Sequence, residues 1–290
     1  MPSPLLRRWT GATAAAVLLL AGCDTAPSTT DTPAAAPDQP GTFEAPTDPA
    51  FAALVDALGH DGITALLDSE DEAAIAAAFA PYGIGYEIVD VTAAEAAMEQ
   101  EDPEDARLGT TITECPQYFG TSYRSKWFTL KGAGGSESHY VDGSGRPGAA
   151  YKRLPPDVTA PRSSSCQTNI GNWASPASSY DGGHLIGSQL GGWGKRANIV
   201  PQHYNFNRGN WKRIEDRLAQ CDALPYAAIE YYVIVDYPNS STLTPNYFHS
   251  YVNVNYGGYV GGHFTNTSGG GSNGRAESDR VINHLISKGC

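Results

Sequence analysis

The sequence predicts an α+β fold, and three observations support this prediction. Apolar residues recur at helical spacing in residues 51–67. Short runs of β-branched and aromatic residues, as in 228–235 and 247–256, are typical of strands. Tracts rich in glycine and serine, above all 269–274, separate these runs. We therefore expect helices and short strands around one core, in a main domain of residues 107–290 that is long enough to bury it.

Residues 50–106 are expected to be rich in helices. Residues 51–58 and 63–67 form two short helical segments that Gly59–Gly62 separates, and a further helical pattern over 73–79 stops at Pro81. Short strands are expected at 86–91, 127–130, 228–235 and 247–256.

One long helix is expected over 209–221, because its apolar residues fall on one face and its charged residues mostly elsewhere. A last helix is expected over 277–287. The apolar positions of the 209–221 helix are Trp211, Ile214, Leu218 and Cys221.

The first residues have the features of a secretory signal. Residues 1–22 contain two arginines, then an apolar run, then small residues. The run is too short to span a bilayer comfortably. Leu20-Ala21-Gly22-Cys23 resembles a bacterial lipobox, in which the cysteine is lipidated; an ordinary signal peptide with a chance cysteine is the alternative. Residues 23–49, rich in Pro, Thr and Ala, are expected to form a disordered tether.

Four cysteines remain once Cys23 is set aside. An even number in an exported chain indicates two disulfides, with three possible connectivities. A zinc site is the alternative, but no two of these cysteines form a C-x-x-C pair. The four residues are Cys115, Cys166, Cys221 and Cys290.

Charge divides the chain into two unlike parts. The net charge is −12, yet residues 24–106 contain 19 acidic and no basic residues. Residues 107–290 contain 12 acidic and 17 basic residues, a net charge of +5. A basic part indicates a nucleic-acid or membrane partner. Residues 50–106 are expected to form a small acidic, α-rich module before the main domain.

Four motifs stand in a fixed order between residues 178 and 221. They are Asp181-Gly182-Gly183-His184, Leu190-Gly191-Gly192, Asn198-Ile199-Val200-Pro201-Gln202, and Asn207-Arg208-Gly209-Asn210-Trp211 continuing to Glu215. This combination resembles the DNA/RNA non-specific endonuclease family of ββα-metal (His-Me finger) nucleases. The resemblance implies a ββα-metal finger embedded in a mixed, mainly antiparallel sheet.

The histidine of the first motif is the candidate general base. Phosphodiester hydrolysis needs a base for the attacking water, a cation for the developing charge and a donor for the leaving oxygen. A neutral imidazole suits the first role near pH 7, and the resemblance assigns that role to His184. The two preceding glycines permit a tight turn and a close backbone approach to a phosphate. A core or capping histidine is the alternative.

The asparagine of the last motif is the candidate metal ligand. Asn207 is expected at the start of the 209–221 helix, where free N–H groups and the helix dipole favour a phosphate. The resemblance makes it the ligand of one divalent cation. Because an amide oxygen is a weak ligand, the cation would keep several waters, which suits Mg²⁺, with Mn²⁺ as a substitute. A plain N-cap asparagine is the alternative.

Three further residues are expected to support this site. Glu215 lies eight residues after Asn207, about 12 Å along a straight helix, so both cannot grip one ion unless the helix entry is bent. We expect Glu215 to hold a water beside the ion; a solvated carboxylate is the alternative. Asn198 is expected to brace the site by hydrogen bonds or to shape a turn. Asp181 either orients His184 or closes a turn.

The cation that stabilises the transition state is the open part of the site. Many relatives have an arginine at the position of Gly182, and another where this chain has Ala219. Arg208, Arg213 and Arg217 are the candidates to replace them, and Arg208 comes first because it borders the expected metal ligand.

Other cations are candidates for phosphate contacts. Lys195 and Arg196, in a glycine-rich loop, and Arg213 are expected to contact the nucleic-acid backbone without reading sequence. A solvated loop is an equal alternative for the first two. Trp211 is expected to anchor the helix in the core rather than to stack on a base.

These observations predict an exported, membrane-tethered endonuclease that hydrolyses DNA and RNA with little sequence preference, with His184 as base and one Mg²⁺. It would be a cell-envelope lipoprotein or be secreted after release. The alternative is a non-catalytic nucleic-acid-binding lipoprotein, and a toxin with an immunity partner ranks lowest. Residues 50–106 would be either an intramolecular inhibitor that covers the cationic groove or a solubilising spacer. The P-loop motif G-x-x-x-x-G-K is absent from the sequence.

Overall fold

A seven-stranded sheet forms the centre of the protein. The computed structural model describes residues 46–90, 115–132, 135–224 and 227–290. The strand order is β1-β2-β3-β4-β7-β8-β9, in which β1 and β2 run parallel and all other neighbours run antiparallel. The mainly antiparallel α+β fold is therefore confirmed. The strands are β1 Gly85–Asp90, β2 Lys126–Gly132, β3 Gly135–Val141, β4 Pro147–Leu154, β7 Ile229–Asp236, β8 Tyr247–Val254 and β9 Tyr259–Thr265.

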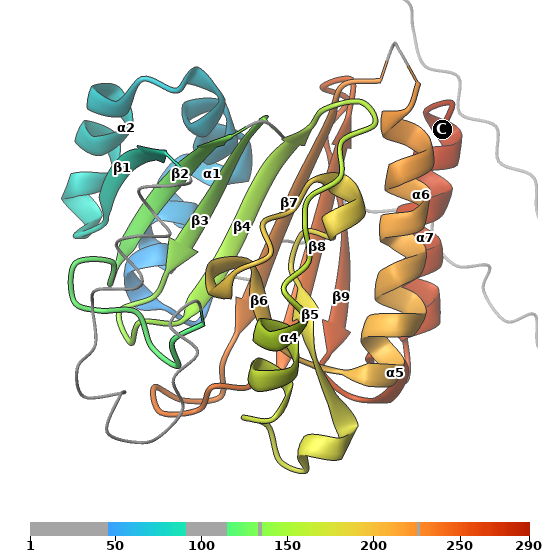
Figure 1. The fold of residues 1–290 in the computed structure, drawn as a ribbon. Coiled ribbons are helices and arrows are strands. Elements are labelled where there is room, and N and C mark those ends of the chain that lie inside the picture. The colour runs from blue at the N-terminus through green and yellow to red at the C-terminus, as the bar shows by residue number, and fades with distance from the viewer. Residues whose placement is uncertain (1–45, 91–114, 133–134, 225–226) are drawn as a thin grey trace, which may run out of the picture. The chain divides into compact units, whose positions relative to one another are not determined.

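Two helices of the acidic segment pack on one face of this sheet (Figure 1). Asp48 caps α1 (Pro49–Ser69) by accepting a hydrogen bond from the backbone N–H of Phe51 at 2.9 Å. Gly59, with φ of 67°, kinks α1 at the expected break. The second helix, α2 (Glu72–Phe79), follows directly. The apolar cluster under these helices includes Phe51, Leu54, Ile63, Phe79, Trp127, Tyr140, Tyr232 and Tyr251.

By length and composition alone, α1 is apolar enough to cross a membrane. Its buried residues, however, lie in the same apolar cluster as strand residues such as Trp127 and Tyr232. A helix that contributes its apolar side to a shared core is explained by that core. We therefore interpret α1 as a core helix.

The described part of the acidic segment is integrated into the sheet domain. Strand β1 pairs with β2 over six residues, and α1 and α2 share an apolar core with the sheet. The structure thus places residues 46–90 in the same compact unit as the main domain, not in a module of their own. Residues 91–106, like the signal peptide, Cys23 and the tether up to residue 45, lie outside the described residues.

The opposite face of the sheet is covered by α6 (Lys212–Asp222) and α7 (Gly274–Ser287), as Figure 1 shows. Every residue of strand β7 is buried. Alternate side chains of the strand point to opposite faces of the sheet, and both faces are covered. Tyr231 and Val233 face α6 and α7, whereas Tyr232 faces α1. Trp211 is fully buried among Phe206, Phe248 and Phe264, which confirms it as a core anchor.

A ββα unit lies on this second face. Strands β5 (Tyr180–His184) and β6 (Ile199–His203) form an antiparallel pair, in which His184 is opposite Ile199. The chain continues through α5 (Tyr204–Phe206) and a π-helical turn, Asn207–Trp211, into α6. The helix predicted over 209–221 thus begins earlier, at Tyr204.

Both expected disulfides are present. Cys115 pairs with Cys166, and Cys221 pairs with Cys290. The first bridge fastens α4 (Ser164–Gly171), a helix that the sequence did not predict and that packs on β5. The second joins the end of α6 to the last residue of the chain, which would otherwise fray.

A buried charge network connects the sheet to the loop after β5. Both carboxylate oxygens of Glu137 on β3 accept the backbone N–H of Trp193 at 3.1 Å. The ammonium group of Lys152 on β4 lies 3.3 Å from Glu137 Oε2 and donates to the carbonyl of Gly191 at 2.8 Å. His139 Nε2 lies 2.9 Å from Glu137 Oε1. Burial raises the pKa of Glu137, but these partners outweigh it and hold the pKa below its usual value.

Glu137→Ala is expected to lower the free energy of unfolding by about 3–5 kcal/mol, because it leaves the ammonium group of Lys152 buried without its counter-charge. Urea-induced unfolding measures the change. The matched control is Glu87→Ala, which breaks a partly exposed ion pair to Lys126 and should cost less than about 1 kcal/mol. Equal losses in the two variants would contradict this account of the network.

Candidate active site

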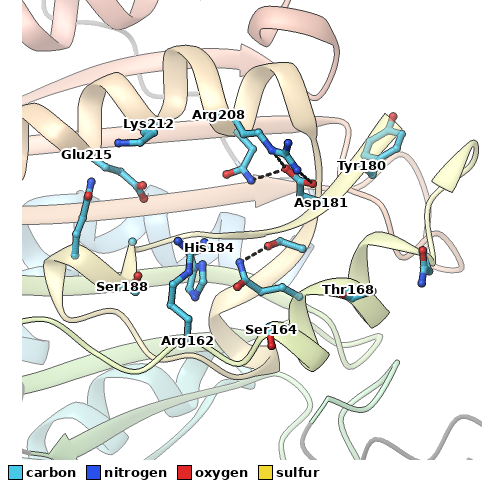
Figure 2. Close-up of a pocket in the computed structure, with 16 residues that line it drawn as sticks. Arg162, Ser164, Thr168, Tyr180, Asp181, His184, Ser188, Arg208, Lys212 and Glu215 are labelled. Atoms are coloured by element: carbon cyan, nitrogen blue, oxygen red, sulfur yellow. Dashed lines mark hydrogen bonds and ion pairs between the residues drawn. The ribbon is translucent and has the colours of Figure 1, made fainter. Parts of the chain in front are cut away.

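A polar pocket of about 530 Å³ lies where α4 meets the ββα unit (Figure 2). Its walls come from α4, β5, the turn at 187–189, the π-helical turn and α6. His184, Asn207, Arg208 and Glu215 all line it. The structure thus brings together the four residues that the sequence predicts at the centre of the site.

The two glycines before His184 lie inside strand β5 and not in a turn, in contrast to the prediction. A Cβ atom on Gly182 would lie 2.3 Å from the carbonyl oxygen of Gln167 on α4, and one on Gly183 would lie 2.0 Å from Gln202 Oε1. The side chain of Gln167 also donates to the carbonyl of Gly182 at 3.0 Å. The glycines are therefore required because neighbouring segments close directly onto the strand.

The imidazole of His184 is buried at the pocket wall. Burial, and secondly the positive charge of Arg162, lower the pKa of His184 to about 4, against an opposing effect of Glu137. The ring is therefore neutral at neutral pH, as a general base must be. Its Nε2 atom has no hydrogen-bond partner among the described residues. A buried nitrogen without a partner indicates a place for water or substrate.

Asn198 braces the loop that follows His184. Its Oδ1 accepts the backbone N–H of Ile186 at 2.9 Å. Its Nδ2 donates to the carbonyls of Ile186 at 2.8 Å and Trp193 at 2.9 Å. The carbonyl of Asn198 also accepts the N–H of Leu185 at 2.8 Å. These bonds fix the backbone on the C-terminal side of the candidate base.

Asp181 orients the other side of the site. Its carboxylate accepts two hydrogen bonds from Arg208, at 2.7 and 2.8 Å, and one from Asn207 Nδ2 at 3.2 Å. The sequence left two roles open for Asp181, orienting His184 or closing a turn. In the structure its carboxylate instead holds the side chains of Asn207 and Arg208. Because Asp181 takes the amide nitrogen, the amide oxygen of Asn207 is left for another partner.

Asn207 is not at a helix start, in contrast to the prediction. The helical segment is capped by His203, whose ring accepts the N–H of Asn205 at 3.3 Å, and the N–H of Asn207 already bonds the carbonyl of Tyr204. The alternative of a plain N-cap is therefore wrong. Gly209, with φ of −105° and ψ of −108°, bends the π-helical turn. This is the bent helix entry that lets Asn207 and Glu215 line one pocket.

Glu215 is buried and not solvated. Burial, and secondly the charge of Asp216, raise the pKa of Glu215 to about 8. Its Oε1 atom has no partner among the described residues. A Cβ atom on Gly187 would lie 2.8 Å from the Glu215 carboxyl carbon, so the carboxyl group packs tightly under the turn after β5.

The donors of the pocket fit a hard divalent cation. The amide oxygen of Asn207 is an oxygen ligand of the kind that Mg²⁺ accepts, and the pocket has room for the waters that this ion retains. The unpartnered Oε1 of Glu215 is the buried atom that such a hydrated ion would satisfy. Across the described ranges, no group of three or more His, Cys, Asp and Glu is arranged to hold a metal.

Three expected phosphate contacts lie elsewhere. Arg196 is fully buried and donates to the backbone carbonyls of Pro116, Gln117 and Ile199, so it is a structural residue. Arg213 joins α6 to α7 by an ion pair with Asp279 at 2.6 Å. The third, Lys195, is half-buried, and none of the three lines the pocket.

The described part of the acidic segment, residues 46–90, does not line the pocket. None of the pocket-lining residues comes from 46–90. These residues pack against the other face of the sheet. The described part of the segment thus gives the inhibitory role no support, and the two roles expected of residues 50–106, inhibitor or spacer, stay predictions.

The residues that sequence reasoning missed come from α4 and the residue pair before it. Arg162, Ser164, Gln167 and Thr168 line the pocket opposite the ββα unit. They stand in a serine-rich stretch without a helical pattern of apolar residues. The cysteine at 166 was the available signal, because a disulfide there fastens a segment that would otherwise be a loop.

Comparisons with known proteins agree with the motif resemblance. Residues 127–256 match the model of the DNA/RNA non-specific endonuclease family. Among solved structures, the chain is similar to NucA from Streptococcus agalactiae with no metal bound, at 18% identity and a TM-score of 0.36, and to NucA with magnesium ion bound, at 18% and 0.35. Each alignment covers 45% of this chain and 70% of that chain. No curated protein matches. Residues 127–256, which include the ββα unit, thus match the model of the DNA/RNA non-specific endonuclease family.

Proposed function

We propose that the chain is an exported, metal-dependent endonuclease that hydrolyses DNA and RNA with little sequence preference. The observation that carries this proposal is the shared pocket, in which a neutral buried histidine, an asparagine oxygen and a buried carboxyl group converge. Two buried atoms in it, Nε2 of His184 and Oε1 of Glu215, lack partners among the described residues. Such atoms are expected where water, an ion and a phosphate are to bind.

In this mechanism His184 removes the proton from a water that attacks the phosphorus. The neutral ring accepts the proton at Nε2, and the hydrogen bonds of Asn198 hold the backbone next to it. The low pKa of His184 keeps the ring unprotonated before attack. Positioning matters as much as basicity, because the water must lie in line with the leaving oxygen.

A divalent cation, when bound, supplies Lewis-acid stabilisation of the charge that develops on the phosphoryl group and leaving 3′ oxygen. Asn207 would hold it, with Mg²⁺ or Mn²⁺ as the fitting ions. Asp181 fixes the side-chain amide of Asn207, and Glu215 closes the opposite wall and would orient a water there. The chain thus supplies few direct ligands but a rigid frame.

We further propose that the protein acts outside the cytoplasm. Two disulfides support this location, because such bridges persist in oxidising compartments. The lipobox interpretation of Cys23 leaves two forms, a cell-envelope lipoprotein or a protein secreted after release. Mass spectrometry of the membrane fraction for a diacylated Cys23 distinguishes them.

His184→Ala is expected to lower turnover by about 10²–10⁴-fold, because it removes the general base. Conversion of supercoiled plasmid and of a structured RNA, with Mg²⁺ and with chelator, measures this loss. Thermal unfolding checks that the variant keeps its fold. Undiminished plasmid cleavage by the folded variant would refute the assignment, and wild-type protein that binds DNA without cutting it would favour a non-catalytic binding protein.

Asn207→Ala is expected to weaken metal binding at least about 10-fold. The fraction of Mn²⁺ bound, followed by electron paramagnetic resonance in the absence of nucleic acid, measures this directly. The matched control is Asn205→Ala, an exposed asparagine two residues earlier that bonds Ser268, and it should bind Mn²⁺ as the wild type does. Unchanged binding by Asn207→Ala would exclude Asn207 as the ligand.

Glu215→Gln is expected to change the pH dependence of stability in the metal-free protein. Because folding raises the pKa of Glu215 from 4.5 to about 8, the folded state holds a proton that the unfolded state releases between these values. This contribution is therefore present below pH 4.5 and is lost as the pH rises towards 8. Urea unfolding with chelator should show Glu215→Gln gaining on the wild type across this window; parallel curves would contradict the raised pKa.

A further inference from the structure

Three cations line the pocket, and they differ in their partners. Arg208 is engaged by Asp181 in a two-bond ion pair, and Lys212 pairs with Asp216. Arg162 has no hydrogen bond or ion pair with any residue that the structure describes. Figure 2 shows it beside His184, whereas Arg208 is turned towards Asp181. Arg162, whose charge acts on His184, is thus the cation of the pocket that has no carboxylate partner among the described residues.

The backbone at Arg162 is held from both sides although its side chain is exposed. Before it, the N–H of Ala160 donates to the carbonyl of Ser188 at 2.8 Å, which ties the segment to a pocket-lining turn. After it, Ser163 caps α4 by accepting the N–H of Cys166, which the disulfide to Cys115 fastens. A fixed backbone with an unengaged guanidinium group is the arrangement expected of a residue that binds an anion.

The neighbouring carbonyl also packs closely. A Cβ atom on Gly194 would lie 2.5 Å from the carbonyl oxygen of Pro161. The loop at 191–195 is itself anchored to the sheet by Glu137 and Lys152. The position of Arg162 is therefore set by the same frame that positions the loop after His184.

The close packing of α4 on β5 explains how Arg162 reaches the site. Gly182 has no side chain, so Gln167 on α4 contacts the strand backbone directly. Any side chain at position 182 would push α4, and with it residue 162, away from the pocket. The second position considered for a cation, Ala219, packs against the apolar core and does not line the pocket.

We propose that Arg162 binds the scissile phosphate of the nucleic acid and stabilises its negative charge in the transition state, and that Arg208 is a positioning residue held by Asp181. This proposal rests on the proposed nuclease function and names the cation of that site. A guanidinium group suits this task because its planar fork matches two phosphate oxygens. A positive group placed where negative charge develops stabilises the transition state.

The electrostatics of His184 support this placement. The charge of Arg162 is the second cause, after burial, of the low pKa of His184, while Glu137 on β3 acts in the opposite direction. The guanidinium group is thus close enough for its field to reach the imidazole ring. A phosphate bound between the two would lie next to the base that activates its attacking water.

The test compares Arg162→Gln with Arg275→Gln, which removes an exposed arginine on α7 that pairs with Asp279. Initial rates of cleavage of a short duplex and a single strand are measured in Mg²⁺. Arg162→Gln is expected to lower kcat by about 10²–10³-fold, Arg275→Gln to keep wild-type activity, and Arg208→Gln to lose less than Arg162→Gln. Circular dichroism and thermal unfolding should show Arg162→Gln folded, since Arg162 has no hydrogen bond or ion pair to lose within the described ranges. The other two variants should also fold, because each removes only an ion pair of an exposed arginine.

A second readout needs neither metal nor substrate. In chelator-treated protein, an NMR titration of the His184 ring should give a higher pKa in Arg162→Gln than in the wild type, because a positive charge that disfavours the imidazolium is gone. The acidic limb of the pH profile of kcat/KM should move up with it.

The outcomes separate the two proposals. Wild-type protein without Mg²⁺-dependent cleavage would overturn the proposed function itself. An active wild type, with an inactive His184→Ala and an Arg162→Gln that cleaves at the wild-type rate, would overturn the role of Arg162 alone. A larger loss in Arg208→Gln than in Arg162→Gln would assign the phosphate to Arg208 instead.

Discussion

The buried carboxylate of Glu137 connects the sheet to the catalytic loop. It accepts the N–H of Trp193, and its partner Lys152 holds the carbonyl of Gly191, so two strands of the sheet grip the loop that follows the candidate base. An apolar contact would not fix a loop in this way, because only directed bonds to backbone groups specify one conformation. Asn198 connects this loop to Ile186, two residues after His184, because its side chain bonds both the N–H and the carbonyl of Ile186. The site therefore inherits the rigidity of the sheet, although almost none of its residues belongs to the sheet.

The parts of the site that the sequence predicts are those that are local in the chain. His184, Asn198, Asn207 and Glu215 lie within 32 residues, and a hairpin followed by a helix brings such residues together without help from distant segments. Arg196 illustrates the opposite case. Its sequence context is a basic, glycine-rich loop, but its three carbonyl partners include Pro116 and Gln117, about 80 residues away. Nothing local distinguishes such a buried structural arginine from one that contacts phosphate.

The role expected of the acidic segment followed from its charge, and charge does not specify which surface a segment covers. Its carboxylates are mostly exposed, whereas its apolar residues Phe51, Leu54 and Phe79 bury the aromatic face of the sheet. The apolar residues decide where the segment packs, because burying apolar surface stabilises a fold more than exposed charges do. Strand β1 then extends the sheet by one parallel strand. The described residues 46–90 are therefore part of the fold that holds the site, and they do not line the pocket through which an anionic substrate must enter.

Gly182 and Arg162 are best understood together. Because α4 closes on the strand at Gly182, a long side chain at that position and an α4 packed in this place exclude each other. Arg162 lies just before this helix, and the disulfide of Cys166 fastens the helix. The segment that leaves no room for an arginine at position 182 therefore places Arg162 at the opposite wall of the pocket. The motif alone thus suggests a site short of one cation. The cation, Arg162, comes from the segment before α4, which packs on β5 and is held by the disulfide. The motif does not include this segment.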